Sequence, residues 1–212
     1  MMTLEETRKR ILEDDEFVIA ECRRLQTFYK LKTEIRYGMS RKEQVTTESV
    51  AEHIYALHAL AAYFLPLEDT DKKFDRAKVH LLIEFHDIDE IVTGDIVGFP
   101  KTPEQASLGK SAIPLAIEKL PESMQPMVTA ILDEYGKQQT AEAKFVKALD
   151  KMEPSFHVYN DNGKIINHTV TMVTLEKHRK IKDPYTSMFE VLHRFSDVLS
   201  NTLNKEGYFL KD

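Results

Sequence analysis

Apolar residues along most of this chain recur at steps of three and four, the spacing that places them on one face of an α-helix. Near the N-terminus, Phe17, Glu21, Leu25, Phe28 and Leu31 follow this spacing and predict a first long helix. Alternation of the strand type is rare, and glycine is scarce, with 7 residues in 212. The pattern therefore predicts an all-α protein.

Capping and helix-breaking residues place the next two helices. Ser49 followed three residues later by Glu52 is a capping-box pattern, and it opens a second helix that we expect to stop just before Pro66. A third helix is expected to run from about Asp75 to Gly94, because glycine is common at a helix C-terminus.

The second half of the chain is also mainly helical in pattern. Further helical segments are expected over 103–114, 122–135, 140–154 and 186–203. Pro154 is expected to kink or end the third of these. The stretch 165–175 is ambiguous, because the turn at Asn162-Gly163 precedes β-branched residues and can also start a hairpin. We interpret the basic run from Lys177 to Lys182 as a solvated helix end, with contact to substrate or a second subunit as the alternative.

Helical phase directs several ionisable residues toward the interior. His53, the pair His86-Asp87 and Asp150 each follow or share an apolar stripe, and Glu90 lies within one turn of His86 and Asp87. The stripes contain Val50, Leu57, Val79, Leu82, Ala143 and Val146. Imidazole and carboxylate together form a mixed nitrogen and oxygen ligand set, which suits borderline to hard metal ions and leaves positions for water and substrate.

Each of these residues has a purely structural interpretation. A histidine on an apolar face is often a hydrogen-bonded core residue, and an aspartate such as Asp150 can cap a helix or pair with a lysine. Burying several ionisable groups together without a neutralising cation is costly, however. Their coincidence on three predicted helices therefore favours a metal site.

Composition and charge exclude several classes of function. The net charge is −6 with 30% charged residues, so nothing indicates binding to a nucleic acid polymer or an anionic membrane. A phosphate-bearing substrate would need a local basic pocket. Cys22 is the single cysteine, which excludes an internal disulfide and a cysteine-based zinc site. We see no run approaching a membrane span and no secretory signal, so we expect a cytoplasmic protein.

Three segments of the chain together resemble the HD-domain superfamily of metal-dependent phosphohydrolases, and within it the 5′-deoxynucleotidase branch. They are Ser49 to His53, His86 to Ile96, and Ala141 to Lys151. The resemblance runs from about Arg36 to Tyr159. It implies a single HD-domain helical bundle over residues 1–212, with a core of about 36–160, an N-terminal helix and a C-terminal helical extension.

The resemblance also implies an activity. Members of this branch remove the 5′-phosphate of (deoxy)nucleoside monophosphates by attack of a metal-activated water, and they are usually homodimers. One divalent ion is expected, of Co, Mn, Mg, Ni or Zn.

Residue roles follow from the same resemblance. The implied metal ligands are His53, His86, Asp87 and Asp150. Glu90 and Asp95 match acidic residues near the attacking water and the leaving group, and Arg36 matches an arginine that holds the phosphate. Arg41, Lys144 and Lys147 are weaker candidates for the same pocket, the two lysines being expected on a solvated or dimer-facing side. Family members often place a tryptophan beside the phosphate arginine. Tyr37 takes that place here, which leaves the choice between ribose and deoxyribose open.

Other functions stay open at this point. The chain resembles HD phosphodiesterases and pyrophosphohydrolases of larger nucleotides less well, because these tend to carry a Glu-Asp pair where this chain has Asp89-Glu90. A di-iron oxygenase needs additional histidine ligands, for which only His157 has a suitable phase. A non-catalytic HD module that binds a nucleotide or a partner protein is the alternative from another class.

Overall fold

The computed structural model describes residues 2–38, 47–96, 102–159 and 163–211. In these ranges the regular elements are helices, and the only β-type contacts are two isolated bridges. The elements in chain order are α1 (Leu4–Glu13), α2 (Asp15–Leu25), the 3₁₀ helices η1 (Gln26–Lys32) and η2 (Arg36–Gly38), α3 (Val50–Glu68), α4 (Arg76–Phe85), α5 (Glu90–Thr93), α6 (Pro103–Ile117), α7 (Gln125–Lys137), α8 (Ala141–Val158), α9 (Gly163–Ile165), the π-helix η3 (Ile166–Thr171), α10 (Leu175–Thr186) and α11 (Glu190–Lys205). The expected all-α class is confirmed.

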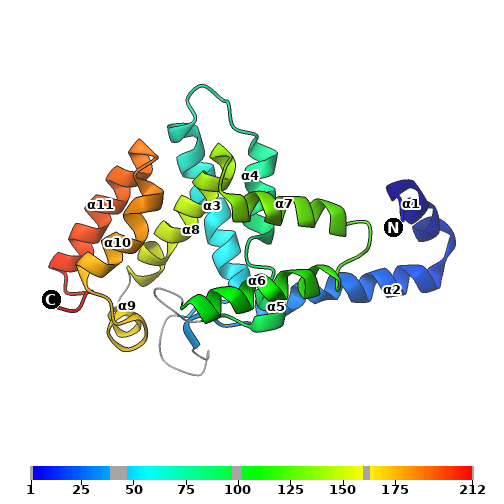
Figure 1. Ribbon diagram of the computed structural model, residues 1–212, viewed down its shortest axis with the longest axis horizontal. Helices are drawn as coiled ribbons and strands as arrows, with labels where there is room; N and C mark the ends of the chain where they lie inside the picture. Colours follow the sequence, from blue (N-terminus) through cyan, green and yellow to red (C-terminus); the bar gives the residue numbers. More distant parts are fainter. Residues whose placement is uncertain (1, 39–46, 97–101, 160–162, 212) are drawn as a thin grey trace.

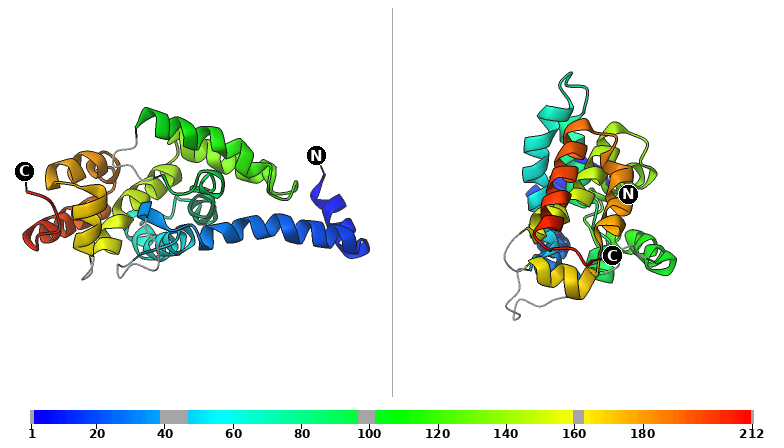
Figure 2. Two further views of the ribbon diagram at one scale, coloured as in Figure 1. Left: turned by 90° about the horizontal axis from the view of Figure 1, so that it is seen from below. Right: turned by 90° about the vertical axis from the view of Figure 1, so that its left-hand side faces the viewer.

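The helices form an elongated body in which α3, α4 and α8 lie in the middle (Figure 1). Helices α10 and α11 cover the end that carries the C-terminus. Helices α1 and α2 extend away from the body at the opposite end (Figure 2). The buried polar residues His53 and Asp150 come from α3 and α8, and His86 is the residue that follows α4.

Helix α8 is the centre of the core. It packs against α3 and α4 on one side and against α10 and α11 on the other. The core residues along it are fully buried: Ala143, Phe145, Val146, Ala148, Leu149 and Met152. Burying one such large apolar side chain contributes roughly 1.5–3 kcal/mol. This packing holds Asp150, on the same helix, in a fixed position.

The predicted starts of α3, α4 and α8 are confirmed. Ser49 and Glu52 form a capping box, in which the Glu52 N–H donates to Ser49 Oγ (3.3 Å) and the Ser49 N–H donates to Glu52 Oε2 (2.6 Å). Thr140 caps α8 by accepting from the Ala143 N–H (3.2 Å), and Asp75 caps α4. These local hydrogen bonds fix where the site-bearing helices begin.

The expectations that prolines end helices are wrong. Pro66, Pro114 and Pro154 lie inside α3, α6 and α8, which continue to Glu68, Ile117 and Val158. Each proline removes one backbone hydrogen bond. It lies near the C-terminal end of its helix, however, so few later residues depend on that bond.

Two predicted long helices are each divided. The predicted first helix, over Phe17 to Leu31, is the α-helix α2 up to Leu25 and continues as the 3₁₀ helix η1. The preceding helix α1 was not predicted, and Asp14 separates it from α2 by accepting from the Phe17 N–H (3.0 Å). The predicted helix from Asp75 to Gly94 breaks into α4 and α5, with tight turns over 86–89 between them. Gly94 caps α5 with φ of +68°, as its position predicted. The His-Asp pair therefore lies in the break.

The C-terminal region differs most from the sequence interpretation. The stretch expected to be ambiguous is a short helix followed by the π-helix η3, with no hairpin in its described part. The run from Lys177 to Lys182 lies within α10 and is not a solvated helix end, because His178 and Lys182 are buried. The final helix begins at Glu190, after Thr186 ends α10. The expected turn at Asp161-Asn162 lies outside the described residues.

One helix corrects the expectation about membrane spans. By length and composition, α3 could cross a membrane, with a mean hydropathy of 1.2. Core helices of soluble proteins meet the same criterion, so one such helix is weak evidence. Helix α3 buries Leu57, Ala61 and Phe64 against the rest of the core and carries His53 on the same side.

Candidate metal centre

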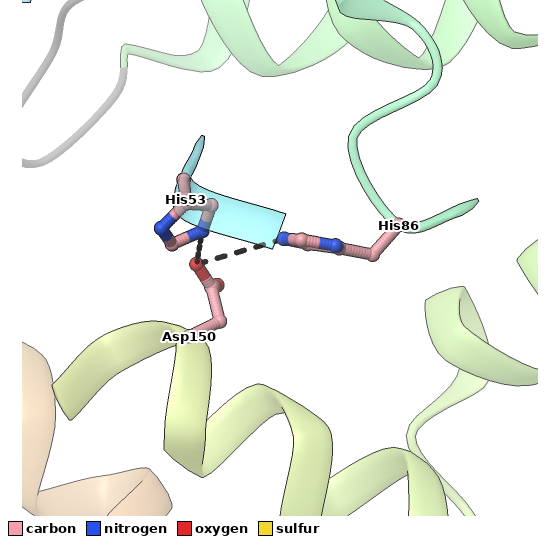
Figure 3. Close-up of side chains that lie close together, drawn as sticks. All are labelled: His53, His86 and Asp150. Atoms are coloured by element: carbon pink, nitrogen blue, oxygen red, sulfur yellow. Dashed lines mark ion pairs between the residues drawn. The ribbon is translucent and has the colours of Figure 1, made fainter. Parts of the chain in front are cut away.

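Three predicted ligands from separate helices meet at one point. His53 comes from α3, His86 from the end of α4 and Asp150 from α8, and their side chains point toward one another (Figure 3). Asp150 Oδ1 lies 3.7 Å from His53 Nε2 and 4.0 Å from His86 Nε2. Atoms that bind one cation at about 2 Å lie about 3–4 Å apart, so the spacing fits a shared ion better than direct hydrogen bonds.

Asp87 lies at the same point. Its Oδ2 is 3.0 Å from His86 Nε2 and 3.8 Å from His53 Nε2. The turns after α4 place this carboxylate beside the imidazole that precedes it in sequence. All four sequence-predicted ligand residues are thus brought together, with two nitrogen and two carboxylate donors.

Hydrogen bonds from the outer ring nitrogens orient both imidazoles. His53 Nδ1 lies 2.9 Å from Glu153 Oε2, and His86 Nδ1 lies 2.9 Å from the Ile83 carbonyl oxygen. If each Nδ1 carries the proton and donates, each Nε2 presents a lone pair to the centre. This carboxylate or carbonyl support is typical of metal-ligating histidines.

The inner ring nitrogens supply a direct test of fit to a metal. His53 Nε2 and His86 Nε2 are buried and have no hydrogen-bond partner within the described part of the chain. A buried polar atom without a partner costs about 1–3 kcal/mol. A divalent cation bound by these two nitrogens and by Asp87 and Asp150 would satisfy both, so the residues present fit such an ion.

Charge around the centre is strongly coupled. Burial and the Arg36 guanidinium act to lower the pKa of His53, but the carboxylates of Asp150 and Glu153 outweigh them and raise the pKa to about 9. Burial acts to raise the pKa of Asp87, and the adjacent His86 imidazole reverses this and holds the pKa well below its usual range. Without a metal the raised pKa favours a proton on His53, and a bound cation would displace that proton to reach the ring nitrogen.

Two lysines contact the second carboxylate oxygen of Asp150, the one that does not face the histidines. This oxygen, Oδ2, accepts from Lys147 Nζ (3.0 Å) and Lys151 Nζ (3.1 Å). Burial opposes ionisation, but these two ammonium groups hold the pKa of Asp150 well below its usual range. The expectation that Lys147 is solvated or dimer-facing is wrong, because it bridges Asp150 and Tyr135 inside the site. Lys147 lies three residues before Asp150, a helical spacing that indicates this contact.

Glu90 is buried at the edge of the centre. Its Oε2 has no hydrogen-bond partner among the described residues. Burial, followed by the nearby charges of Asp87 and Asp95, raises the pKa of Glu90 to about 10. Asp95 also faces the pocket, and its Oδ2 accepts from the Tyr37 backbone N–H (2.7 Å). Both acidic residues therefore lie where the sequence placed them, beside the ligands.

Arg36 and Tyr37 form the entrance side. The Arg36 guanidinium pairs with Glu48 and lies 3.5 Å from Glu153 Oε2. Tyr37 has a φ of +65°, which is uncommon outside glycine, and its ring stacks on His157 with centroids 5.7 Å apart. His157 is thus directed at Tyr37 and at Glu48 (3.4 Å), away from the predicted ligands.

A cavity of about 250 Å³ opens beside the ligands. On its metal side it is lined by Arg36, Tyr37, Asp87, Glu90, Asp95 and Asp150. The remaining lining residues include Ser155 on α8 and, from the C-terminal region, Asn167, Thr171, His178 and Lys182. For the run from Lys177 to Lys182, contact with substrate was the alternative, and two of its residues line the cavity. The other residues of this second group were not predicted, because no local pattern links them to the motifs. Lys144 is not among the cavity residues, and Arg41 lies outside the described residues.

The fold and site define an all-helical protein with a buried centre of histidine and aspartate ligands. The family model described as the HD domain matches residues 28–190, wider than the core of about 36–160 expected from the motifs. The chain therefore belongs to the HD-domain family of metal-dependent phosphohydrolases.

Curated relatives and a solved structure are similar to this chain. The 5′-deoxynucleotidase HDDC2 of Bos taurus is 31% identical over 126 residues, which cover 58% of this chain and 59% of that protein. The Homo sapiens protein of the same name is 29% identical over 126 residues, with the same coverage. The chain thus matches about six tenths of the length of these relatives.

A crystal structure described as a predicted metal-dependent phosphohydrolase from Magnetospirillum magnetotacticum MS-1 has a similar fold. Its TM-score is 0.71 at 22% identity, covering 92% of this chain and 98% of that chain. The match extends over nearly the whole of both chains and therefore supports the all-helical fold.

Proposed function

We propose that this protein removes the 5′-phosphate of nucleoside monophosphates, ribo or deoxy, with the help of one divalent cation. The observation that carries the proposal is the pair of unsatisfied, buried imidazole nitrogens beside two carboxylates at the wall of a cavity. The name of the HDDC2 relatives supports the substrate class. The cavity volume of about 250 Å³ supports a small substrate, because drug-sized ligands occupy about 300–1,000 Å³.

The proposed ligands are His53, His86, Asp87 and Asp150. A divalent cation held there lowers the pKa of a water molecule and neutralises phosphate oxygens. The two imidazoles favour Co, Mn, Ni or Zn over Mg, because Mg prefers an all-oxygen shell. The ligand residues keep their geometry through Glu153, the Ile83 carbonyl and Lys147, which hold them from outside.

The other residues have proposed roles in moving protons and binding the substrate. A divalent cation at the ligands would favour the ionised form of Glu90 and lower its raised pKa, and the carboxylate would then be placed to orient and deprotonate the attacking water. Asp95, if protonated, can donate to the leaving oxygen of the sugar. Arg36 presents a planar donor fork suited to phosphate, and Lys151 lies next to Asp150 with its ammonium at the cavity. Tyr37 is proposed to contact the sugar.

The remaining sequence predictions concern organisation. We propose a single domain over residues 1–212, a homodimer and a cytoplasmic location, with neither a nucleic acid polymer nor a membrane as partner. The net charge of −6 supports the absence of polynucleotide binding. Size measurement of the purified chain tests the dimer.

The experiment is a phosphate-release assay on metal-stripped protein resupplied with Co²⁺, Mn²⁺, Mg²⁺, Ni²⁺ or Zn²⁺. The panel contains ribo and deoxy monophosphates, triphosphates, cyclic dinucleotides and guanosine tetraphosphate. We expect metal-dependent release from the monophosphates alone. Release only from the larger nucleotides would replace the proposal with the phosphodiesterase or pyrophosphohydrolase alternative. Tight nucleotide binding without any release would favour the non-catalytic module.

A further inference from the structure

Lys182 is a buried cation at the cavity wall formed by α10. Only 2% of it is exposed, and it lines the same cavity as the metal ligands. Its Nζ donates to Ser155 Oγ (2.5 Å). Within the described ranges it has no further hydrogen bond and no carboxylate within 4.0 Å, so two of its three N–H donors lack a protein acceptor.

The other cations at the cavity are neutralised by the protein itself. Arg36 pairs with Glu48 and Glu153, and Lys147 and Lys151 both pair with Asp150. Lys182 differs from them because no acidic side chain faces it at contact distance. An ammonium group buried without a counter-ion is costly, and lysine is almost never fully buried unless it is paired.

The position of Lys182 relative to the metal centre follows from α8. Ser155, its hydrogen-bond partner, lies five residues after Asp150 on this helix, which corresponds to an axial rise of about 7.5 Å. Lys182 therefore lies beside a position on α8 that is displaced along the helix from Asp150. It has no ion pair with any of the four ligand residues, so a group bound to it would be a second anionic group and not a ligand of the metal.

We infer that Lys182 and Ser155 form an oxyanion subsite that binds a second phosphate of the substrate, distinct from the 5′-phosphate that is removed. This inference rests on the proposed function and extends its substrate class: nucleotides that carry an additional phosphate, such as nucleoside 3′,5′-bisphosphates, would be preferred to the monophosphates. The Nζ supplies the charge and two N–H donors, and the Ser155 hydroxyl supplies a further donor. Free inorganic phosphate has the same chemistry and is the second possible source of the anion.

The ionisation of Lys182 is consistent with an anion partner. Burial lowers the pKa of Lys182 to about 7, against the opposing effect of Glu153. A bound oxyanion would favour the charged form and raise this pKa again.

The test uses the full chain loaded with the most active metal of the panel. Turnover is compared for a nucleoside 5′-monophosphate and the 3′,5′-bisphosphate of the same nucleoside. In the wild type we expect kcat/KM for the bisphosphate to exceed that for the monophosphate at least about tenfold, since one charge-assisted hydrogen bond contributes about 1.5–3 kcal/mol. Lys182→Met should remove this preference and leave kcat/KM for the monophosphate within about threefold.

Two further variants control the comparison. Lys180→Met removes an exposed lysine of the same helix that pairs with Glu176, and it should keep the wild-type preference. Lys182→Gln retains a polar end near Ser155 and removes only the charge, so it should lose the preference as Lys182→Met does. If Lys182→Met fails to fold, the glutamine variant decides the result.

A binding measurement separates this inference from the proposed function. Inorganic phosphate is titrated into metal-stripped protein, in which the metal centre cannot hold phosphate through an ion. Binding that is lost in Lys182→Met but kept in Lys180→Met would support the subsite even if no nucleotide is hydrolysed. If added phosphate accelerates monophosphate turnover and the bisphosphate shows no preference, the anion is free phosphate. Equal binding and equal substrate preference in wild type and Lys182→Met would overturn the inference while leaving the hydrolase proposal intact.

Discussion

The two walls of the cavity differ in what surrounds their buried ionisable side chains. On the metal side, acidic and basic groups are packed together, and the carboxylates of Asp87 and Asp150 lie within 4.0 Å of the His53 and His86 rings. On the α10 side, Lys182 and His178 are buried among neutral partners, Ser155 and Ser200. The first wall has a place for a cation and the second for an anion.

This difference shows how one small cavity can orient a substrate. A metal ion and an isolated ammonium group at the same cavity can hold two different anionic groups of one molecule. On the metal side, His53, His86 and Asp150 each have an outer hydrogen-bond partner that holds the side chain in place. The α10 side has few such partners, so its charges are sensitive to whatever enters the cavity.

The largest effect on the metal side is expected from removing one of the proposed metal ligands. Asp87→Ala should abolish metal retention and reduce turnover by more than about 100-fold, the upper end of what losing an outer partner costs. The helical circular dichroism spectrum should be unchanged, because Asp87 lies in the turns between α4 and α5. Metal content is measured after dialysis, with the exposed Asp133→Ala as control. Near-normal metal content would remove Asp87 from the ligand set.

Removing the acid beside the ligands should separate metal binding from chemistry. Glu90→Gln should retain the metal and lower kcat by about 10²–10⁴-fold, because proton transfer from the attacking water is lost. Steady-state kinetics and metal analysis are run on the same sample. Glu84→Gln, at a more exposed position on α4, is the matched control. A wild-type kcat would show that another group accepts the proton.

A smaller effect on metal affinity is expected from changing Glu153, the residue that orients His53. Glu153→Gln should lower metal affinity by about 10–100-fold, because His53 Nδ1 loses its charged acceptor. Titration with a competing chelator measures the affinity, and Glu153→Asp, which keeps the charge, should recover part of it. If both variants bind metal as tightly as wild type, Glu153 does not orient His53 for metal binding, and its remaining contact is the ion pair with Arg36.

On the α10 side, the buried His178 should make the free energy of unfolding depend on pH. Burial, followed by Lys182 and Arg179, lowers the pKa of His178 to about 2, compared with an ordinary value of 6.5. A depressed folded-state pKa means that the unfolded chain binds more protons, so this contribution to stability is complete above pH 6.5 and declines as the pH falls toward 2. At pH 5 the loss is about 2 kcal/mol in the free energy of unfolding, from 1.36 kcal/mol per pH unit.

Urea unfolding at several pH values measures this loss. His178→Gln should show a smaller decline between pH 7.5 and 5 than wild type, whereas the exposed His193→Gln should decline as wild type does. Comparing slopes cancels the contributions of all other titrating groups. An identical decline in wild type and His178→Gln would show that His178 is not held in the neutral form in the folded protein.

Local sequence patterns anticipated the metal side far better than the α10 side. His53 and Asp150 share helical stripes with core residues, so helical phase alone turned them inward. The His86-Asp87 pair was located correctly for a partly wrong reason, because the predicted continuous helix is broken there. The apolar residues before the pair had already set the direction of His86.

The sequence by itself determined the helical class, the caps at Ser49 and Thr140, and the inward direction of the ligand residues, because these depend on hydrogen bonds and periodicities within a few residues. Only the tertiary structure decided that α10 faces the cavity and buries Lys182 against Ser155, 27 residues away in sequence. That contact depends on how α8 and α10 pack. A basic run looks the same in sequence whether its helix lies against solvent or against a cavity.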